Sequence, residues 1–136
     1  MTPQATPDRI DAARTALIVY DACRRALTPA DPARRAAMRP VLDAWVTLIG
    51  ACRARAMPII YTTPVSRADG SDVVLLPTDL SVETGVREAF SMDFDTVVVR
   101  DCCWSGAAAA HAFSLDTSMK MYARVRTLEQ TLAMLR

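Results

Sequence analysis

Short, uninterrupted runs of apolar residues alternate with amphipathic stretches along most of the chain. A run without polar alternation is typical of a strand that is buried on both faces, as in a parallel sheet. The pattern predicts five such strands, at residues 15–20, 58–62, 73–76, 96–100 and 121–125.

The amphipathic stretches between these runs predict helices. In one of them, apolar residues recur at three- and four-residue steps: Leu42, Trp45, Val46, Ile49 and Cys52. Residues 24–40, rich in alanine, arginine and proline, are predicted to form a loop that enters this helix. Further helices are predicted from residue 79 or 80 to 91, at 104–115 and at 127–135. Thr127 and Gln130 have the spacing of a capping box for the last one.

Strands that alternate with helices predict an α/β fold with a parallel sheet and right-handed crossovers. Residues 1–14 are predicted to be a flexible arm, and residues 15–136 a single domain. One connection is unusual, because only about ten residues separate the second predicted strand from the third. A crossover between neighbouring parallel strands needs a dozen or more residues. We therefore expect that these two strands are not neighbours, or that a unit has been lost between them.

The composition is typical of one folded domain. The nearly neutral net charge gives no reason to expect a strongly charged partner. Of 136 residues, 51% are apolar and 23% are charged, and the formal net charge is +1. Because no basic run is present, we expect neither nucleic acid nor a membrane as a partner. We find no apolar stretch long enough for a bilayer, no secretory signal in the first residues and no C-x-x-C spacing among the four cysteines. A cytoplasmic protein with free thiols is expected.

The candidate chemistry lies where strands end. In open parallel sheets, ligands bind beyond the carboxyl ends of the strands, at the switch point in strand order. Asp21 ends the first predicted strand, and Ser81 lies at the elbow between the third strand and the next helix. If these two strands flank the switch point, both side chains share one cleft. The alternative is that Asp21 is an ordinary loop residue and Ser81 an ordinary residue of a first helical turn.

The elbow resembles the nucleophile region of the isochorismatase-like cysteine hydrolases, a family that includes nicotinamidases and carbamoyl-sarcosine-type amidases. Matching positions there are Thr78, Asp79, Val82, Arg87 and Ala89. Residues 16–21 resemble the strand that delivers the family's aspartate. Residues 97–103, His111 and residues 123–129 resemble its last strands and final helix. The resemblance, which begins at about residue 12, implies a Rossmann-like, three-layer α-β-α sandwich with a parallel sheet of about five strands, one βα unit shorter than the family.

The sequence departs from the catalytic pattern that this resemblance implies, a triad of aspartate, lysine and cysteine. Asp21 matches the aspartate, but Ser81 fills the cysteine position, and Lys120, the only lysine, is in the wrong place. The resemblance also implies a cis peptide bond four residues before the nucleophile, here Leu76–Pro77, followed by a backbone N–H in the oxyanion hole. Pro77 has no N–H. In other enzymes, the loss of one oxyanion-hole donor lowers the catalytic rate by a factor of roughly 10²–10³.

Few other side chains could activate the Ser81 hydroxyl as a nucleophile. A serine hydroxyl needs a paired base, and Asp21 alone is a weak one unless burial raises its pKa. His111, the only histidine, is predicted to have a structural or surface role. Cys23 lies two residues after Asp21 and is predicted, with Pro77 and Thr78, to contact a substrate. Cys102 and Cys103 are interpreted as small buried hydrophobic residues, and neither a metal nor another cofactor is expected.

The leading interpretation is an isochorismatase-like domain that has lost the family's hydrolase chemistry and acts as a binding or assembly subunit. Its expected partners are a second copy or an intact relative, because the missing edge unit should leave an apolar surface, and a small-molecule ligand. The alternative is a small-molecule hydrolase that cleaves an amide C–N or ester bond with Ser81 as nucleophile and Asp21 as base. A third reading is thiol chemistry through Cys23.

Overall fold

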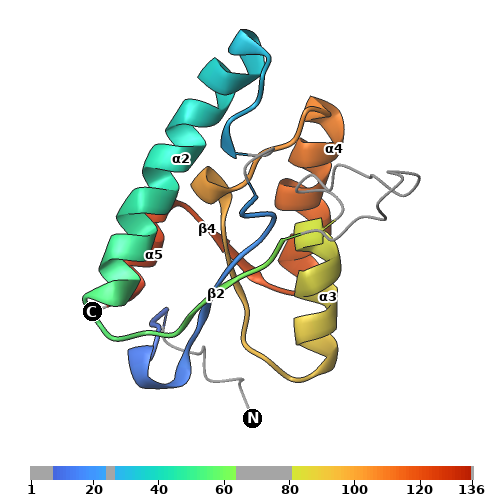
Figure 1. The fold of residues 1–136 in the computed structure, drawn as a ribbon. Helices are drawn as coiled ribbons and strands as arrows, with labels where there is room; N and C mark the ends of the chain where they lie inside the picture. Colours follow the sequence, from blue (N-terminus) through green and yellow to red (C-terminus); the bar gives the residue numbers. More distant parts are fainter. Residues whose placement is uncertain (1–7, 24–26, 64–80, 136) are drawn as a thin grey trace.

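The computed structural model describes residues 8–23, 27–63 and 81–135. Its strands form two parallel pairs (Figure 1). Strand β1 (Leu17–Val19) pairs with β2 (Ile59–Tyr61), in a register that sets Ile18 opposite Ile60. Strand β3 (Val97–Val99) pairs with β4 (Arg124–Arg126), with Val98 opposite Val125.

Four of the five predicted strands are therefore found, each shorter than predicted. The remaining predicted strand, at residues 73–76, lies outside the described residues. A sheet of five strands is therefore not established. The predicted strand 121–125 is wrong in its first half. Met121 belongs to a 3-10 turn at Met119–Met121 and is 70% exposed, and β4 begins only at Arg124. An apolar run alone does not distinguish a strand from an apolar turn.

The longest helix, α2 (Pro32–Arg53), begins well inside the segment predicted to be a loop. Asp31 caps it, since its carboxylate accepts the backbone N–H groups of Ala33 and Arg34, both at 3.1 Å. Pro32 occupies the first helical position, where its missing N–H would have no helical partner anyway. The helix continues through Pro40, so the loop prediction for 24–40 is wrong from Pro32 onward.

The other helices largely follow the predictions. Helix α3 (Glu83–Ser91) is preceded by one wide helical turn at Ser81 and Val82. Helix α4 (Ala108–Phe113) starts four residues later than predicted and continues into tighter and wider turns up to Met121.

The final helix, α5 (Leu128–Met134), has the predicted capping box. Thr127 Oγ1 accepts the Gln130 N–H at 3.1 Å, and Gln130 Oε1 accepts the Thr127 N–H at 3.0 Å.

Helices lie on both sides of the strands, with α2 and α5 on one side and α3 and α4 on the other (Figure 1). Each side has its own apolar cluster. Leu48 and Cys52 of α2 pack with Met57 and Leu135, while Val86, Val98, Leu115 and Met119 form the second cluster. No helix among the described residues is long and apolar enough to cross a bilayer.

Candidate functional site

The structure brings Asp21 and Ser81 into direct contact. The Ser81 hydroxyl donates a hydrogen bond to Asp21 Oδ2 at 3.0 Å, across a sequence separation of 60 residues. Asp21 lies just beyond the carboxyl end of β1, and Ser81 begins the helical turn that leads into α3. The two residues that the sequence placed at separate strand ends therefore share one location.

Asp21 has a left-handed backbone, with φ of 55°. This region is uncommon for residues other than glycine, although aspartate and asparagine tolerate it best. The end of β2 holds the turn, because Thr62 Oγ1 accepts the Asp21 N–H at 3.3 Å and Thr62 O accepts the Ala22 N–H at 2.9 Å. Such conformations cost about 1–3 kcal/mol and cluster at functional sites.

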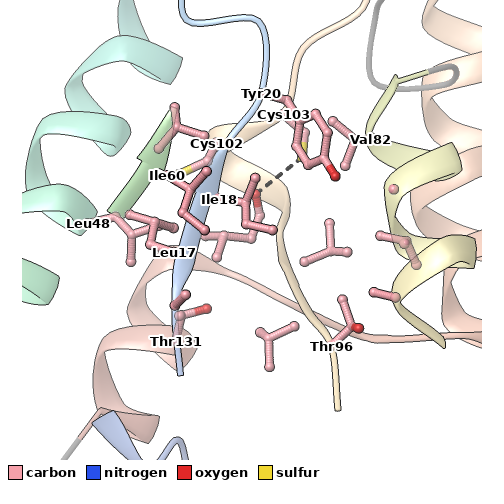
Figure 2. Close-up of a pocket in the computed structure, with 18 of the residues that line it drawn as sticks. Leu17, Ile18, Tyr20, Leu48, Ile60, Val82, Thr96, Cys102, Cys103 and Thr131 are labelled. Atoms are coloured by element: carbon pink, nitrogen blue, oxygen red, sulfur yellow. Dashed lines mark hydrogen bonds between the residues drawn. The ribbon is translucent and has the colours of Figure 1, made fainter. Parts of the chain in front are cut away.

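Helix α3 reaches this turn because Gly85 has no side chain. A β-carbon at position 85 would lie 2.6 Å from Tyr20 Cζ and closer still to the phenol oxygen. Figure 2 shows the Tyr20 ring extending from the end of β1 toward α3. Burial raises the pKa of Tyr20, and the neighbouring charge of Asp21 adds to the shift, so the phenol stays neutral. The close packing sets the position of Ser81, one turn before Gly85, relative to Asp21.

A cavity runs between β1, β3, α2 and α3 (Figure 2). Its volume of about 1770 Å³ exceeds that of a typical small-molecule site, because its walls follow the strands from Arg9 at one end to Trp104 at the other. Asp21, Cys23 and Ser81 line the end of the cavity at the carboxyl edge of the strands, where ligands bind in open parallel sheets.

The other predicted site residues lie in different places. Cys23 is half-buried and borders the cavity, whereas Pro77, Thr78 and the Leu76–Pro77 bond lie outside the described residues. Neither His111 nor Lys120 is among the described residues that line the cavity. Lys120 Nζ instead lies 3.8 Å from the Asp116 carboxylate on an exposed surface.

The thiols after β3 are held in their neutral form. Burial raises the pKa of both Cys102 and Cys103 to about 12. The Cys103 thiol also donates to Val99 O at 3.4 Å, the dashed contact in Figure 2. Because the thiolate is the reactive species, these two groups are poor nucleophiles at neutral pH. Within the described part of the chain, no group of three histidine, cysteine or carboxylate side chains is arranged to hold a metal ion.

Sequence reasoning missed an ionic network that holds α3 from the opposite side. The Glu83 carboxylate accepts from Ser114 at 2.6 Å and Ser118 at 2.7 Å, and it pairs with Arg87 at 2.7 Å. These bonds lower the pKa of Glu83 to about 2, the two serine hydroxyls having the largest effect. Arg87 also donates to Tyr122 Oη at 2.9 Å. The four-residue spacing of Glu83 and Arg87 was the available signal.

Two comparisons with known proteins concern the fold and the C-terminal half of the chain. Residues 76–130 match the family model described as the isochorismatase domain. The solved structure of an isochorismatase family protein from Burkholderia thailandensis has the same fold, with a TM-score of 0.65 at 20% identity over 88% of this chain and 94% of that chain. No curated protein matches. The chain therefore has an isochorismatase-like α/β fold, and its residues 76–130 are similar to the isochorismatase domain.

Proposed function

We propose that this protein is a ligand-binding member of the isochorismatase-like family that has lost the family's hydrolase chemistry. The observation that carries the proposal is the bond between the Ser81 hydroxyl and the Asp21 carboxylate, with no lysine or histidine among the described residues that line the cavity. A hydroxyl becomes a nucleophile only when a base removes its proton, and carboxylates are weak bases toward alcohols. Because the Ser81 proton is already donated to Asp21, the pair presents oxygen acceptors in a fixed position to a small molecule.

The proposed role includes assembly with a second copy or an intact relative. The last turn of α3 and the segment after it carry three exposed apolar side chains, Phe90 (51% exposed), Met92 (58%) and Phe94 (65%). An apolar surface of this kind is typical of an interaction site. Analytical ultracentrifugation over a range of concentrations tests it. A monomer at every concentration, both alone and when mixed with an intact family member, contradicts the assembly role.

Binding and turnover can be separated with a panel of small amides, esters and carboxylic acids. We expect ligand-observed NMR to detect binding that Ser81→Ala weakens, and chromatography to detect no product. Ser91→Ala is the matched control, because the Ser91 hydroxyl only bonds to Glu88 O at the far end of α3. Absence of any binding contradicts the proposal, as does turnover that Ser81→Ala abolishes and Ser91→Ala leaves intact.

A second candidate is a hydrolase in which Ser81 attacks an amide or ester carbonyl. The 3.0 Å hydrogen bond favours it, because a general base must lie within about 2.6–3.2 Å of the proton it removes. The Ser81 proton would pass to Asp21 and from there to the leaving amine or alcohol. Water would then hydrolyse the acyl-serine, releasing the carboxylic acid and restoring the Ser81 hydroxyl. This candidate requires that acylating probes label Ser81 and that Ser81→Ala abolishes labelling. No labelling by amide- and ester-type probes rejects it.

A further inference from the structure

Arg34, near the start of α2, has a charged group for which the described residues provide no side-chain acceptor. Its guanidinium carbon lies 4.7 Å from the centroid of the Trp104 ring, in a cation–π contact. Its Nε is buried and has no hydrogen-bond partner among residues 8–23, 27–63 and 81–135, and no carboxylate in these ranges pairs with the side chain. A partly buried cation without a counter-ion is costly, so this arrangement favours an anion from outside.

The topology places Arg34 at the same edge as the Asp21–Ser81 pair. Helix α2 follows β1 and leads to its parallel neighbour β2, so α2 begins at the carboxyl end of the strands. Four arginines of the described residues line the cavity: Arg9, Arg14, Arg34 and Arg124. Arg9 and Arg14 precede β1, and Arg124 begins β4, where it pairs with Asp8 and Asp95. Arg34 is therefore the arginine of this set at the candidate site.

The surroundings keep Arg34 in position. Trp45 lies eleven residues, or three turns, further along the same face of α2, and its indole N–H donates to Cys102 O at 2.8 Å. This bond fixes α2 against the segment after β3 that carries Trp104. Before the helix, Arg35 bonds to Pro29 O at 3.0 and 3.1 Å and holds the entering loop. The nearest acidic group on the same element, Asp31, is already occupied by the N–H groups of Ala33 and Arg34.

We propose that Arg34, stacked on Trp104, binds an oxyanion of the ligand, a carboxylate or a phosphate, at the cavity end that holds Asp21 and Ser81. The inference rests on the proposed binding function and assigns it a ligand class. The planar guanidinium matches such a group with two parallel hydrogen bonds, and the indole ring restricts its orientation. A positive charge here also offsets the repulsion that Asp21 would exert on an anionic ligand.

Calorimetric titration with benzoate, its neutral analogue benzamide, and inorganic phosphate tests the inference. We expect benzoate or phosphate to bind more tightly than benzamide. Arg34→Gln should weaken binding of the anion about tenfold, a typical effect of losing one charge-assisted contact, and leave benzamide unchanged. Arg34→Lys keeps the charge without the planar fork and should give an intermediate affinity. Arg39→Gln is the matched control, because Arg39 is on the same helix with its side chain 77% exposed.

The outcomes separate this inference from the function on which it rests. Benzamide binding as tight as that of the anions, with no effect of Arg34→Gln, overturns the oxyanion site and leaves the binding function intact. No binding of any of the three compounds overturns both. Binding of an anion that depends on Arg34 supports the site, and the comparison of benzoate with phosphate shows which oxyanion it prefers. Thermal melting of each variant establishes that the fold is retained.

Discussion

The phenol ring of Tyr20 occupies the space that a side chain on residue 85 would need. The distance from Tyr20 Cζ to an ideal β-carbon on Gly85 is 2.6 Å, shorter than carbon atoms approach in folded proteins. Strand β1 and helix α3 therefore approach each other as closely as they do because one helical position has no β-carbon. Ser81 lies one turn before that position, so the contact also determines where its hydroxyl lies.

Gly85→Ala should destabilise the protein, although alanine is ordinarily the better helix former by about 1 kcal/mol. The added methyl group overlaps Tyr20, and overpacking of this kind costs about 1–3 kcal/mol. Urea unfolding measures the effect. Gly50→Ala in α2 is the matched control, since among the described residues no atom beyond the surrounding backbone of α2 and the two chain neighbours lies within 4 Å of its ideal β-carbon. It should stabilise the protein. Equal effects of the two substitutions would contradict the role given to Tyr20.

Glu83 should make stability depend on acid pH. Its pKa is lowered from 4.5 to about 2 in the folded protein, so its contribution is complete above about pH 5 and is lost as the pH falls toward 2. We expect a contribution of about 1–2 kcal/mol, less than the full shift would give because Arg87 is half exposed. Urea unfolding of wild type and Glu83→Gln should differ at pH 7 and converge near pH 2. Glu88→Gln, on the same helix, is the control for the loss of one carboxylate.

Removing the cap of α5 should cost stability. Thr127→Ala removes the hydroxyl that accepts the Gln130 N–H and disrupts the capping box, a loss of about 0.5–2 kcal/mol. The expected result is a lower thermal midpoint without loss of the fold. Thr47→Ala is the control, because the exposed Thr47 hydroxyl only bonds to Asp43 O within α2. A larger loss for Thr47→Ala would be inconsistent with the capping role.

The four thiols should differ in their reactivity toward a disulfide reagent. Burial raises the pKa of Cys52, Cys102 and Cys103, so we expect these three to react at neutral pH only when the protein unfolds. Half-buried Cys23 is the candidate for faster reaction. Absorbance kinetics with and without urea measure this, and Cys23→Ser should remove any fast phase. A fast phase that survives in Cys23→Ser would contradict the assignment, and an inert Cys23 would exclude thiol chemistry there.

Local signals in the sequence predicted local structure well. The capping box at Thr127 and Gln130 is confirmed because both partners lie within one helical turn. The start of α2 was missed although Asp31 and Pro32 form a recognisable start signal, because the alanine-, arginine- and proline-rich surroundings indicated a loop.

Contacts between distant segments were predictable only where topology constrains them. Asp21 and Ser81 could be brought together because carboxyl ends of parallel strands share an edge. The contacts of Glu83 with Ser114 and Ser118, and of Arg34 with Trp104, depend on how whole helices pack. No spacing along the chain encodes these contacts.

Because Asp21 has a left-handed backbone, the charge of the site can change during evolution while its shape is kept. Asparagine accepts the same backbone conformation and has nearly the same size, so a descendant could lose the negative charge in one substitution while Thr62 still held the turn. Most other residues would strain the turn and shift the end of β1. A lineage that exchanged its chemistry at this position would therefore retain the outline of the site, and its outline would be a poor guide to its activity.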